Sequence, residues 1–316
     1  MFDLPTLTNR TISNEMPPYG VREFWDTEAC GSHFVDEQRG SREFFSKYRE
    51  FRYDSEWHIP VLVPFSETQG KTVLEIGCGN GADGTLFAQA GAIYTGIDLT
   101  NSAVEATRRH FDALGLNGNF QIEHAEHLSF PDETFDFVYS YGVLHHTSNP
   151  NQAFSEVRRV LKPGGKAVIM LYHRRSFNYY IRIMGYMRLR LLWHVLCRFG
   201  RLQEDRDHLS TALKGLRGNQ GPSVWQVHYE NFLRTGFSYL KSENFVHHAT
   251  DGPECPYAYV FDRGDARRVF GEFAKVETKT AHFPLRKYRL GVWIPRSIEQ
   301  WLAAWMGWYL FFYLTK

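Results

Sequence analysis

A glycine-rich turn follows a short apolar run near residue 73. Val73-Leu74-Glu75-Ile76 leads into Gly77-Cys78-Gly79-Asn80-Gly81, and a helical pattern comes next. Glycine lacks a Cβ, so the chain can turn tightly and a ligand can press against the backbone, while the following helix offers N–H groups at its N-terminus. Seventeen positions after Gly81, Asp98 ends the next β-type run, where a carboxylate can accept hydrogen bonds from ribose hydroxyls. The arrangement predicts a nucleotide-like ligand.

Taken alone, the glycine spacing fits more than one such ligand. Gly77, Gly79 and Ala82 also match the fingerprint of NAD and FAD sites, which would make the protein an oxidoreductase. Two later segments, FPDETFDFVYSYGVLHHTSNP at 130–150 and EVRRVLKPGGKAVIMLYH at 156–173, favour another family. With the glycine loop they resemble the signature of class I S-adenosylmethionine-dependent methyltransferases, and the branch with ubiquinone- and menaquinone-biosynthesis enzymes resembles them most. The resemblance covers about residues 71–173 and, more loosely, the last two strands.

The resemblance implies that S-adenosylmethionine is the cofactor and S-adenosylhomocysteine its product. Glu75 would orient the loop and the cofactor's amino group, and Asp98 would bind the ribose hydroxyls. Tyr141 would lie beside the methionine chain and the substrate entrance. The loop itself would wrap the methionine part, at Gly77, Cys78, Gly79 and Gly81.

The same resemblance places the adenine between Leu99 and Leu128, with the backbone around Ala125 and Glu126 reading its edge. Members of the family commonly have an acidic residue where this chain has His124, and that carboxylate accepts a hydrogen bond from the adenine amine. Here a neutral imidazole nitrogen of His124, or the carboxylate of Glu126, would have to take that role.

The residues that could assist methyl transfer are less clearly marked. The methyl group arrives already activated, so the protein mainly has to position an acceptor and exclude water. An oxygen acceptor would gain from a general base, whereas an amine or an activated carbon needs only positioning. The sequence does not choose among the candidate bases, which are His145, His146, Tyr172, His173 and His228.

A metal site is not expected. His145 and His146 are adjacent, and adjacent side chains on a helix point roughly 100° apart, so they cannot both face one ion. His247, His248 and Asp251 form a looser group in a predicted loop, where a metal site, a polar lining for the substrate and plain loop structure all remain open. Cys78 serves as a small filler, with nothing to mark it as a nucleophile.

Alternating β-type runs and helical patterns must position these residues. From residue 71 to 173 the repeated strand–helix order predicts a parallel sheet with helices on both faces. Strands predicted at about 275–282 and 307–314 would complete a Rossmann-like, seven-stranded, mostly parallel α/β sheet. Residues 1–70 are predicted to form an N-terminal helical extension. Residues 71–173 would be the cofactor-binding core, residues 174–262 an inserted helical substrate cap, and residues 263–316 the C-terminal part of the sheet.

The composition indicates which kinds of partner and which cellular compartment to expect. Lys and Arg total 36 against 35 Asp and Glu, a net charge of +1, so no overall electrostatic footprint for nucleic acid exists. Four cysteines lie far apart without metal-binding spacing, which suits a reducing compartment. The first residues lack the pattern of a signal peptide, so a cytoplasmic location is expected.

Two apolar segments bear on membrane contact. The predicted helix from Phe177 to Phe199 carries four arginines among aromatic residues, so it packs as an ordinary amphipathic helix or lies against a membrane or lipid substrate. The uncharged run at 301–314 is shorter than a bilayer-spanning helix, and its second half, GWYLFFYL at 307–314, is predicted to form the last strand of the sheet.

Together these features predict a methyltransferase for a small to medium, apolar or aromatic metabolite, with a lipid- or quinone-like acceptor among the options. An oxidoreductase using NAD or FAD and a non-catalytic cofactor-binding sensor or scaffold are the alternatives. The acceptor atom and the oligomeric state leave no trace in the sequence.

Overall fold

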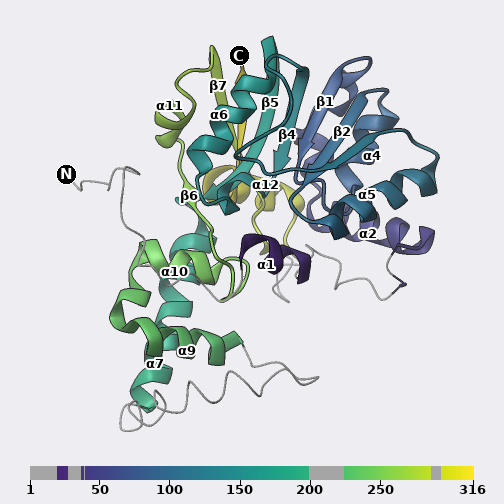
Figure 1. Ribbon diagram of the computed structural model, residues 1–316. Helices are drawn as coiled ribbons and strands as arrows, with labels where there is room; N and C mark the ends of the chain where they lie inside the picture. Colours follow the sequence, from purple (N-terminus) through teal and green to yellow (C-terminus); the bar gives the residue numbers. More distant parts are fainter. Residues whose placement is uncertain (1–19, 28–36, 39, 199–223, 286–292) are drawn as a thin grey trace.

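A single mixed sheet organises the protein (Figure 1). The structure is a computed structural model that describes residues 20–27, 37–38, 40–198, 224–285 and 293–316. The sheet runs in the order β3-β2-β1-β4-β5-β8-β7. The first five strands are parallel, and β8 lies antiparallel to both β5 and β7. The strands are β1 (Thr72–Ile76), β2 (Ile93–Asp98), β3 (Asn119–Ile122), β4 (Phe135–Tyr141), β5 (Leu161–His173), β6 (Val260–Phe261), β7 (Lys275–Ala281) and β8 (Tyr309–Thr315).

The predicted α/β sheet is confirmed, but the prediction of seven strands is one too few. Seven strands form the continuous order, and β6 is added at the end of β5, where Val260 pairs with Tyr172 and Phe261 with His173. A strand of two residues is too short to show a periodic pattern, so β6 could not be predicted. The third strand, β3, ends at Ile122, and the residues after it form a turn that includes the bridge between His124 and His127.

Helices cover both faces of the sheet, as predicted. On one face α6 (Pro150–Val160) and α11 (Asp265–Phe270) contribute Phe154 and Phe270 to a core with Ile76 and Val138. The opposite face is covered by α3 (Ile59–Leu62), α4 (Ala82–Gln89) and α5 (Asn101–Leu114), and η2 (Phe65–Thr68) precedes β1. Both faces of the central strands are therefore buried, as a parallel sheet requires.

Two helices at the N-terminal side lie against the carboxyl ends of the strands (Figure 1). They are α1 (Val21–Thr27) and α2 (Arg42–Ser55). The side chain of Ser41 caps α2 by accepting a hydrogen bond from the Phe44 N–H. Phe44, Phe45 and Tyr48 share the buried face of α2 and pack with Ala82 at the start of α4. This packing brings α2 over the end of β1.

Between β5 and β6 the chain leaves the sheet and forms a separate group of helices, drawn in green and teal below the sheet in Figure 1. They are η4 (Asn178–Met187), α7 (Arg188–Cys197), α9 (Val224–Thr235), η6 (Gly236–Leu240) and α10 (Ser242–Ala249). Their own hydrophobic core includes Ile183, Leu191, Phe232 and Phe245, and Tyr172 and Trp308 connect it to the sheet. The group lies beyond the carboxyl end of β5.

Several predictions about this region need correction. The single helix predicted at 177–199 is a π-helix, η4, followed by the α-helix α7. His247 and His248 lie on α10 rather than in a loop. The remaining helices are α12 (Arg296–Met306) before β8 and the short η3 (Leu144–His146) after β4. The first residues, Cys30, Phe199 and the part of the predicted cap at 199–223 lie outside the described residues.

Within the described residues, no helix has the length and apolar character to cross a bilayer. The uncharged segment that begins at Trp301 divides between α12 and β8, as expected for its second half.

Candidate functional site

The glycine loop joins β1 to α4 at the carboxyl edge of the sheet. Gly77, Gly79 and Gly81 have φ angles of 83°, 55° and 75°, values in the left-handed region that favours glycine. A Cβ on Gly77 would lie 2.1 Å from a methyl group of Val143, so this position has no room for a side chain. A Cβ on Gly79 would meet nothing within 4 Å, because Gly79 faces an open pocket. The loop therefore leaves bare backbone beside the pocket, which suits close contact with a ligand.

Asp98 holds this loop in place. Its Oδ2 accepts a hydrogen bond from the Gly79 N–H at 3.1 Å, while its Oδ1 accepts from the N–H and the hydroxyl of Thr100 at 3.0 and 3.1 Å. Burial raises the pKa of Asp98, and these hydrogen bonds oppose the rise. A carboxylate has about four acceptor positions, so Asp98 can still accept from a ribose hydroxyl.

A pocket of about 560 Å³ extends from the glycine loop along the carboxyl edge of the sheet. This volume lies in the range of small-molecule sites. Among the described residues, its charged lining consists of six carboxylates and two guanidinium groups: Glu75, Asp83, Asp98, Glu105, Glu123, Asp251, Arg52 and Arg109. The pocket is therefore acidic and suits a positively charged ligand.

Glu75 lies deep in this pocket, with only 4% of its surface exposed. The hydroxyl of Tyr94 donates a hydrogen bond of 2.5 Å to its Oε2. Burial and the nearby Asp83 hold the pKa of Glu75 well above its usual value. A cation placed beside this carboxyl group would favour its ionised form and would be attracted to it.

Of the other predicted positions, Cys78 and Tyr141 also line the pocket. Burial raises the pKa of the Cys78 thiol, which keeps it protonated and agrees with its interpretation as a filler. The Tyr141 hydroxyl lies 3.0 Å from Nε2 of His58. Leu99 and Ala125 line the pocket as well, whereas Leu128 is packed in the core beneath it.

The structure changes the roles expected of His124 and Glu126 at the edge of the adenine. Nδ1 of His124 accepts a hydrogen bond from the Glu126 N–H at 3.2 Å, so in the neutral ring the proton lies on Nε2. His124 therefore presents a donor to the pocket rather than an acceptor for the adenine amine. Glu126 points away from the pocket, because its Oε1 accepts from the Ser148 hydroxyl and the Asn149 N–H at the start of α6. A ring nitrogen of the adenine would suit the donor of His124.

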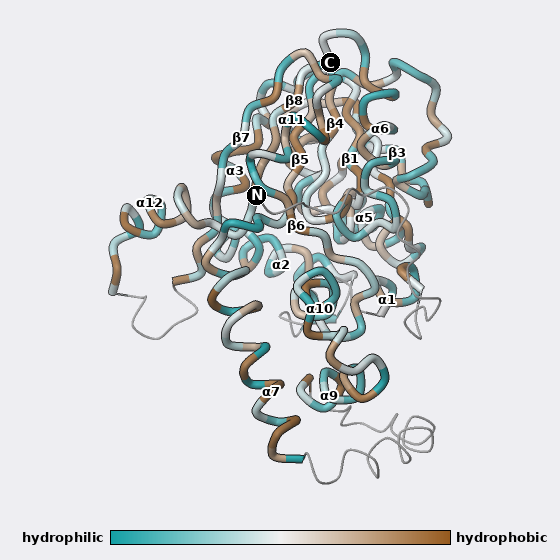
Figure 2. Tube along the Cα trace, turned by 90° about the vertical axis from the view of Figure 1, so that its left-hand side faces the viewer, coloured by the Kyte–Doolittle hydropathy of each residue, from teal (hydrophilic) through white to brown (hydrophobic). Residues whose placement is uncertain are grey.

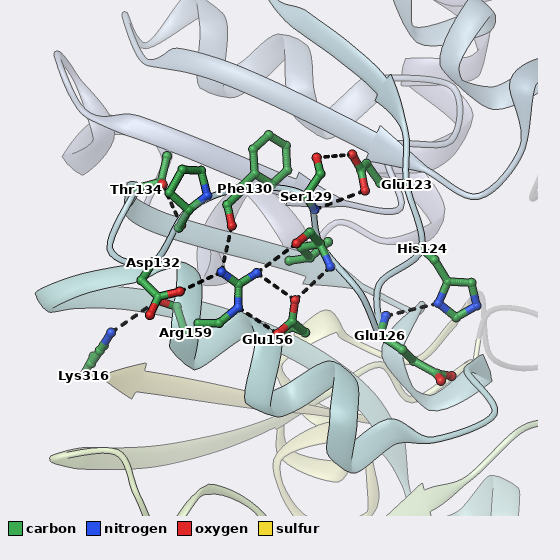
Figure 3. Close-up of polar contacts among 12 residues, drawn as sticks. Glu123, His124, Glu126, Ser129, Phe130, Asp132, Thr134, Glu156, Arg159 and Lys316 are labelled. Carbon is green, nitrogen blue, oxygen red and sulfur yellow. Dashed lines mark hydrogen bonds and ion pairs between the residues drawn. The ribbon is translucent and has the colours of Figure 1, made fainter.

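Arg159 fixes the loop that carries these residues (Figure 3). Its guanidinium donates to the carbonyls of Leu128 and Phe130 at 2.9 and 2.7 Å, and to the carboxylates of Glu156 and Asp132 at 2.8 Å each. Glu156 in turn accepts from the Leu128 N–H at 2.8 Å. One side chain of α6 thus organises the wall of the pocket from outside it.

Two residues of the pocket lining, Arg52 and Asp83, were not predicted as site residues from the sequence. Arg52 lines the pocket and binds the carboxylate of Asp83 through two hydrogen bonds. The guanidinium carbon of Arg52 also lies 5.1 Å from the ring centre of Tyr141. A signal existed, because Phe44, Tyr48 and Arg52 recur every fourth residue on one face of α2, and all three line the pocket.

The structure shows which of the five candidate bases line the pocket and which lie elsewhere. His146 and Tyr172 line the pocket, and they meet Asp251 there. His145 is fully buried away from the pocket, and burial holds its pKa well below the usual value. Nδ1 of His173 hydrogen-bonds the Gly307 carbonyl at 2.9 Å. His228 contacts the Tyr239 hydroxyl within the helical group, at 2.8 Å.

The predicted group of His247, His248 and Asp251 does not form one cluster in the structure. Nδ1 of His247 accepts from the Ala258 N–H at 2.8 Å, and Nδ1 of His248 lies 2.9 Å from the Pro253 carbonyl. Both histidines therefore stabilise the chain around α10, and Asp251 alone of the three reaches the pocket.

Comparisons with known proteins agree with this geometry. A family model described as a methyltransferase domain matches residues 74–169. Ubiquinone biosynthesis O-methyltransferase of Coxiella burnetii is 32% identical over 130 residues, which are 40% of this chain and 56% of that protein. The enzyme of the same name from Haemophilus ducreyi is 33% identical over 121 residues, 37% of this chain and 51% of that protein. The chain thus spans about half the length of the curated relatives it matches.

Among solved structures, a SAM-dependent methyltransferase from Aquifex aeolicus aligns over 87% of this chain and 98% of its own, with 14% identity and a TM-score of 0.45. The matched segment 74–169 contains β1, the glycine loop, Asp98 and the strands that shape the pocket. Residues 74–169 therefore match a methyltransferase domain.

Proposed function

We propose that the protein transfers the methyl group of S-adenosylmethionine to a small or medium-sized acceptor that is largely apolar or aromatic. The observation that carries this proposal is one continuous pocket that joins the glycine loop and Asp98 to a wall of aromatic side chains. The aromatic residues that line it are Trp25, Phe44, Tyr48, Tyr141, Tyr172 and Tyr309.

The charge of the pocket supports this cofactor against a dinucleotide. NAD and FAD carry a negatively charged pyrophosphate, which the loop would have to bind beside Glu75 and Asp98. The positively charged sulfur and amino group of S-adenosylmethionine suit the same carboxylates. Arg52 is already paired with Asp83, so its charge is not available to a pyrophosphate.

The residues of the chain mainly have to bind the cofactor, orient the acceptor and exclude water. When bound, S-adenosylmethionine supplies a methyl group on a positively charged sulfur, which leaves little further chemistry to the protein. The bare backbone at Gly79 and the carboxylate of Asp98 would hold the cofactor. Arg52 and Tyr141 contact one another in the lining of the pocket, where they would limit the position of the acceptor. The helices α1 and α2 cover this end of the sheet and would keep water out.

Exposed apolar side chains support contact with a lipid surface as part of the same proposal. On α7, Leu189, Trp193 and Leu196 are 67%, 69% and 63% exposed, and on α12 both Trp301 and Trp305 are 65% exposed. Figure 2 draws hydrophobic residues along both helices, which lie at the outside of the molecule. Arg190 on α7 adds the positive charge that attracts anionic headgroups. A lipid- or quinone-like acceptor would reach the pocket from such a surface.

Calorimetric titration tests the cofactor assignment. S-adenosylhomocysteine should bind with heat release and should raise the melting temperature, while NAD and FAD should do neither. Binding of a dinucleotide without binding of S-adenosylhomocysteine would instead favour an oxidoreductase. Binding without any methyl transfer to a cell extract would favour the sensor or scaffold.

A further inference from the structure

Three side chains from distant parts of the sequence meet in one part of the pocket lining. His146 ends η3, just after β4, and Tyr172 is the last residue but one of β5. Asp251 follows α10, in the segment that returns from the helical group to the sheet. All three line the pocket. The methyltransferase core and the inserted segment thus build this end of the site together.

The protonation state of His146 follows from its neighbours. Its Nδ1 lies 2.6 Å from the carbonyl oxygen of Tyr257, which can only accept a hydrogen bond, so Nδ1 must carry a proton. In the neutral ring Nε2 is then a bare acceptor. His146 is 3% exposed, and Nε2 has no hydrogen-bond partner within the described residues. A buried acceptor without a donor is costly, so a ligand is expected to supply one.

Asp251 presents a second acceptor to the same point. Its Oδ1 accepts a hydrogen bond from the Tyr172 hydroxyl at 2.8 Å. Its Oδ2 lies 3.5 Å from Nε2 of His146 and, among the described residues, is likewise buried without a donor. Two facing acceptors repel each other until a proton comes between them. The pair is therefore arranged to receive one proton and to share it.

We propose that His146 is the general base of the reaction, that Asp251 is the positioning residue that stabilises its protonated ring, and that the acceptor is therefore a hydroxyl group. This inference rests on the proposed methyl transfer and adds the acceptor atom. An amine or a thiolate would need no such pair. The edge of Trp25 packs on the His146 ring at 5.0 Å between centres, and Tyr172 stacks on Trp308 at 4.5 Å, so neighbouring rings hold both side chains in place.

Methyl transfer to a hydroxyl group requires only the cofactor, the acceptor and the His146–Asp251 pair. The hydroxyl oxygen forms a bond to the methyl carbon as the carbon–sulfur bond of S-adenosylmethionine breaks. The electron pair of the broken bond stays on sulfur, which becomes the neutral sulfur of S-adenosylhomocysteine. The hydroxyl proton passes to Nε2 of His146, and the imidazolium that forms lies 3.5 Å from the Asp251 carboxylate.

Cys255 lies close to this pair but has a different role. Its sulfur is 3.8 Å from Nδ1 of His146, the nitrogen that is already committed to Tyr257. Cys255 does not line the pocket, and burial raises the pKa of its thiol, so it stays protonated. The three residues His146, Asp251 and Cys255 lie close enough for a metal ion, but the thiol approaches Nδ1, the ring nitrogen that already donates to the Tyr257 carbonyl.

The acceptor atom can be tested on the labelled product. The protein is incubated with methyl-labelled S-adenosylmethionine and an extract of its source cells, and methyl esters are removed with mild alkali. Hydriodic acid then cleaves methyl ethers and releases methyl iodide. We expect the remaining label to appear as methyl iodide. Label that resists this cleavage would overturn the inference and leave the proposed methyl transfer intact, whereas no transfer at all would overturn both.

The role of His146 is tested with variants in the same assay. We expect His146→Asn to lower label transfer about 100- to 10,000-fold while S-adenosylhomocysteine binds as tightly as before in calorimetry. The matched control is His173→Asn, since His173 makes the same type of ring-to-carbonyl hydrogen bond outside the pocket. Equal transfer by His146→Asn and the wild type would overturn the assignment.

A spectroscopic measurement separates positioning from general structural damage. In protein labelled with ¹⁵N-histidine, neutral His146 should carry its proton on Nδ1, and Asp251→Asn should shift the titration of the ring to lower pH. The titratable groups that face His146 are His145, Tyr172, His247, Asp251 and Cys255. A proton on Nε2, or an unchanged titration in Asp251→Asn, would overturn the pairing.

Discussion

The guanidinium of Arg52, on α2, donates two hydrogen bonds to the carboxylate of Asp83, the second residue of α4, at 3.0 and 2.6 Å. The hydroxyls of Tyr53 and Tyr139 donate to the same carboxylate at 3.0 and 2.9 Å. Since α4 begins directly after the glycine loop, this pair fastens the N-terminal helix to the helix that shapes the cofactor end of the pocket. The closure of the pocket and the position of the loop therefore depend on one another.

Replacing Arg52 with alanine should destabilise the protein by about 3 kcal/mol, because the Asp83 carboxylate would remain buried without its cation. The Asp83 side chain is only 2% exposed. Urea denaturation measures the loss. Arg49→Ala is the control on the same helix, since among the described residues the Arg49 guanidinium donates only to the Gln89 amide oxygen, at 3.5 Å. A loss of the same size in the two variants would contradict the special role of the Arg52–Asp83 pair.

Replacing Asp98 with alanine should weaken S-adenosylhomocysteine binding by about 1–3 kcal/mol, because a charge-assisted hydrogen bond to the ribose is lost and the Gly79 N–H loses its acceptor. Calorimetry gives the affinity, and a parallel melting curve shows whether the fold survives. Asp112→Ala removes an exposed carboxylate from α5 and should change neither. Unchanged affinity in Asp98→Ala would rule out the ribose assignment.

Replacing Arg159 with alanine should release the loop at 123–134 and cost about 1.5–3 kcal/mol of stability, because its guanidinium holds two carbonyls and two carboxylates. Hydrogen exchange should rise in that loop, while β1 and α4 keep their protection. Arg158→Ala tests the neighbouring position, whose guanidinium points to the Glu272 carbonyl instead. Faster exchange in both variants, or in neither, would contradict the account of this wall.

Acid should destabilise the protein through buried histidines. Burial lowers the pKa of His58 from 6.5 to about 3. Between these values the unfolded chain binds a proton that the folded protein does not, so stability is lost as the pH falls below about 6.5. His58→Gln should reduce the slope of unfolding free energy against pH by about 1.4 kcal/mol per pH unit between roughly pH 4 and 6. An unaltered slope in His58→Gln would mean that His58 is protonated in the folded protein.

Local patterns in the sequence were sufficient for the cofactor end of the site. Val73 to Ile76, the glycines and Asp98 lie within one β-α-β unit, so their spacing along the chain fixes their spacing in space. The same unit determines the parallel order of β1 and β2. A resemblance supplied the identity of the ligand, and the charge of the pocket agrees with it.

The acceptor end could not be predicted in this way. Asp251 and His146 are separated by more than a hundred residues, and only the packing of the helical group on β5 brings them together. Glu126 has the residue type expected for the adenine edge, yet its carboxylate caps the start of α6. Which partner a side chain takes depends on the other groups that compete for it in the folded protein. The spacing of residues along the sequence carries no information on that competition. The boundaries predicted for the substrate cap and the cytoplasmic location stay predictions.

The most direct test of the account is methyl transfer itself. Purified protein is incubated with methyl-labelled S-adenosylmethionine and an extract of its source cells, and the mixture is partitioned into organic, aqueous and macromolecular fractions. The account predicts label in the organic fraction that depends on the protein and is lost in Asp98→Ala. Binding of S-adenosylhomocysteine with no label in any fraction would contradict it and would make the pocket a sensor's site rather than an enzyme's.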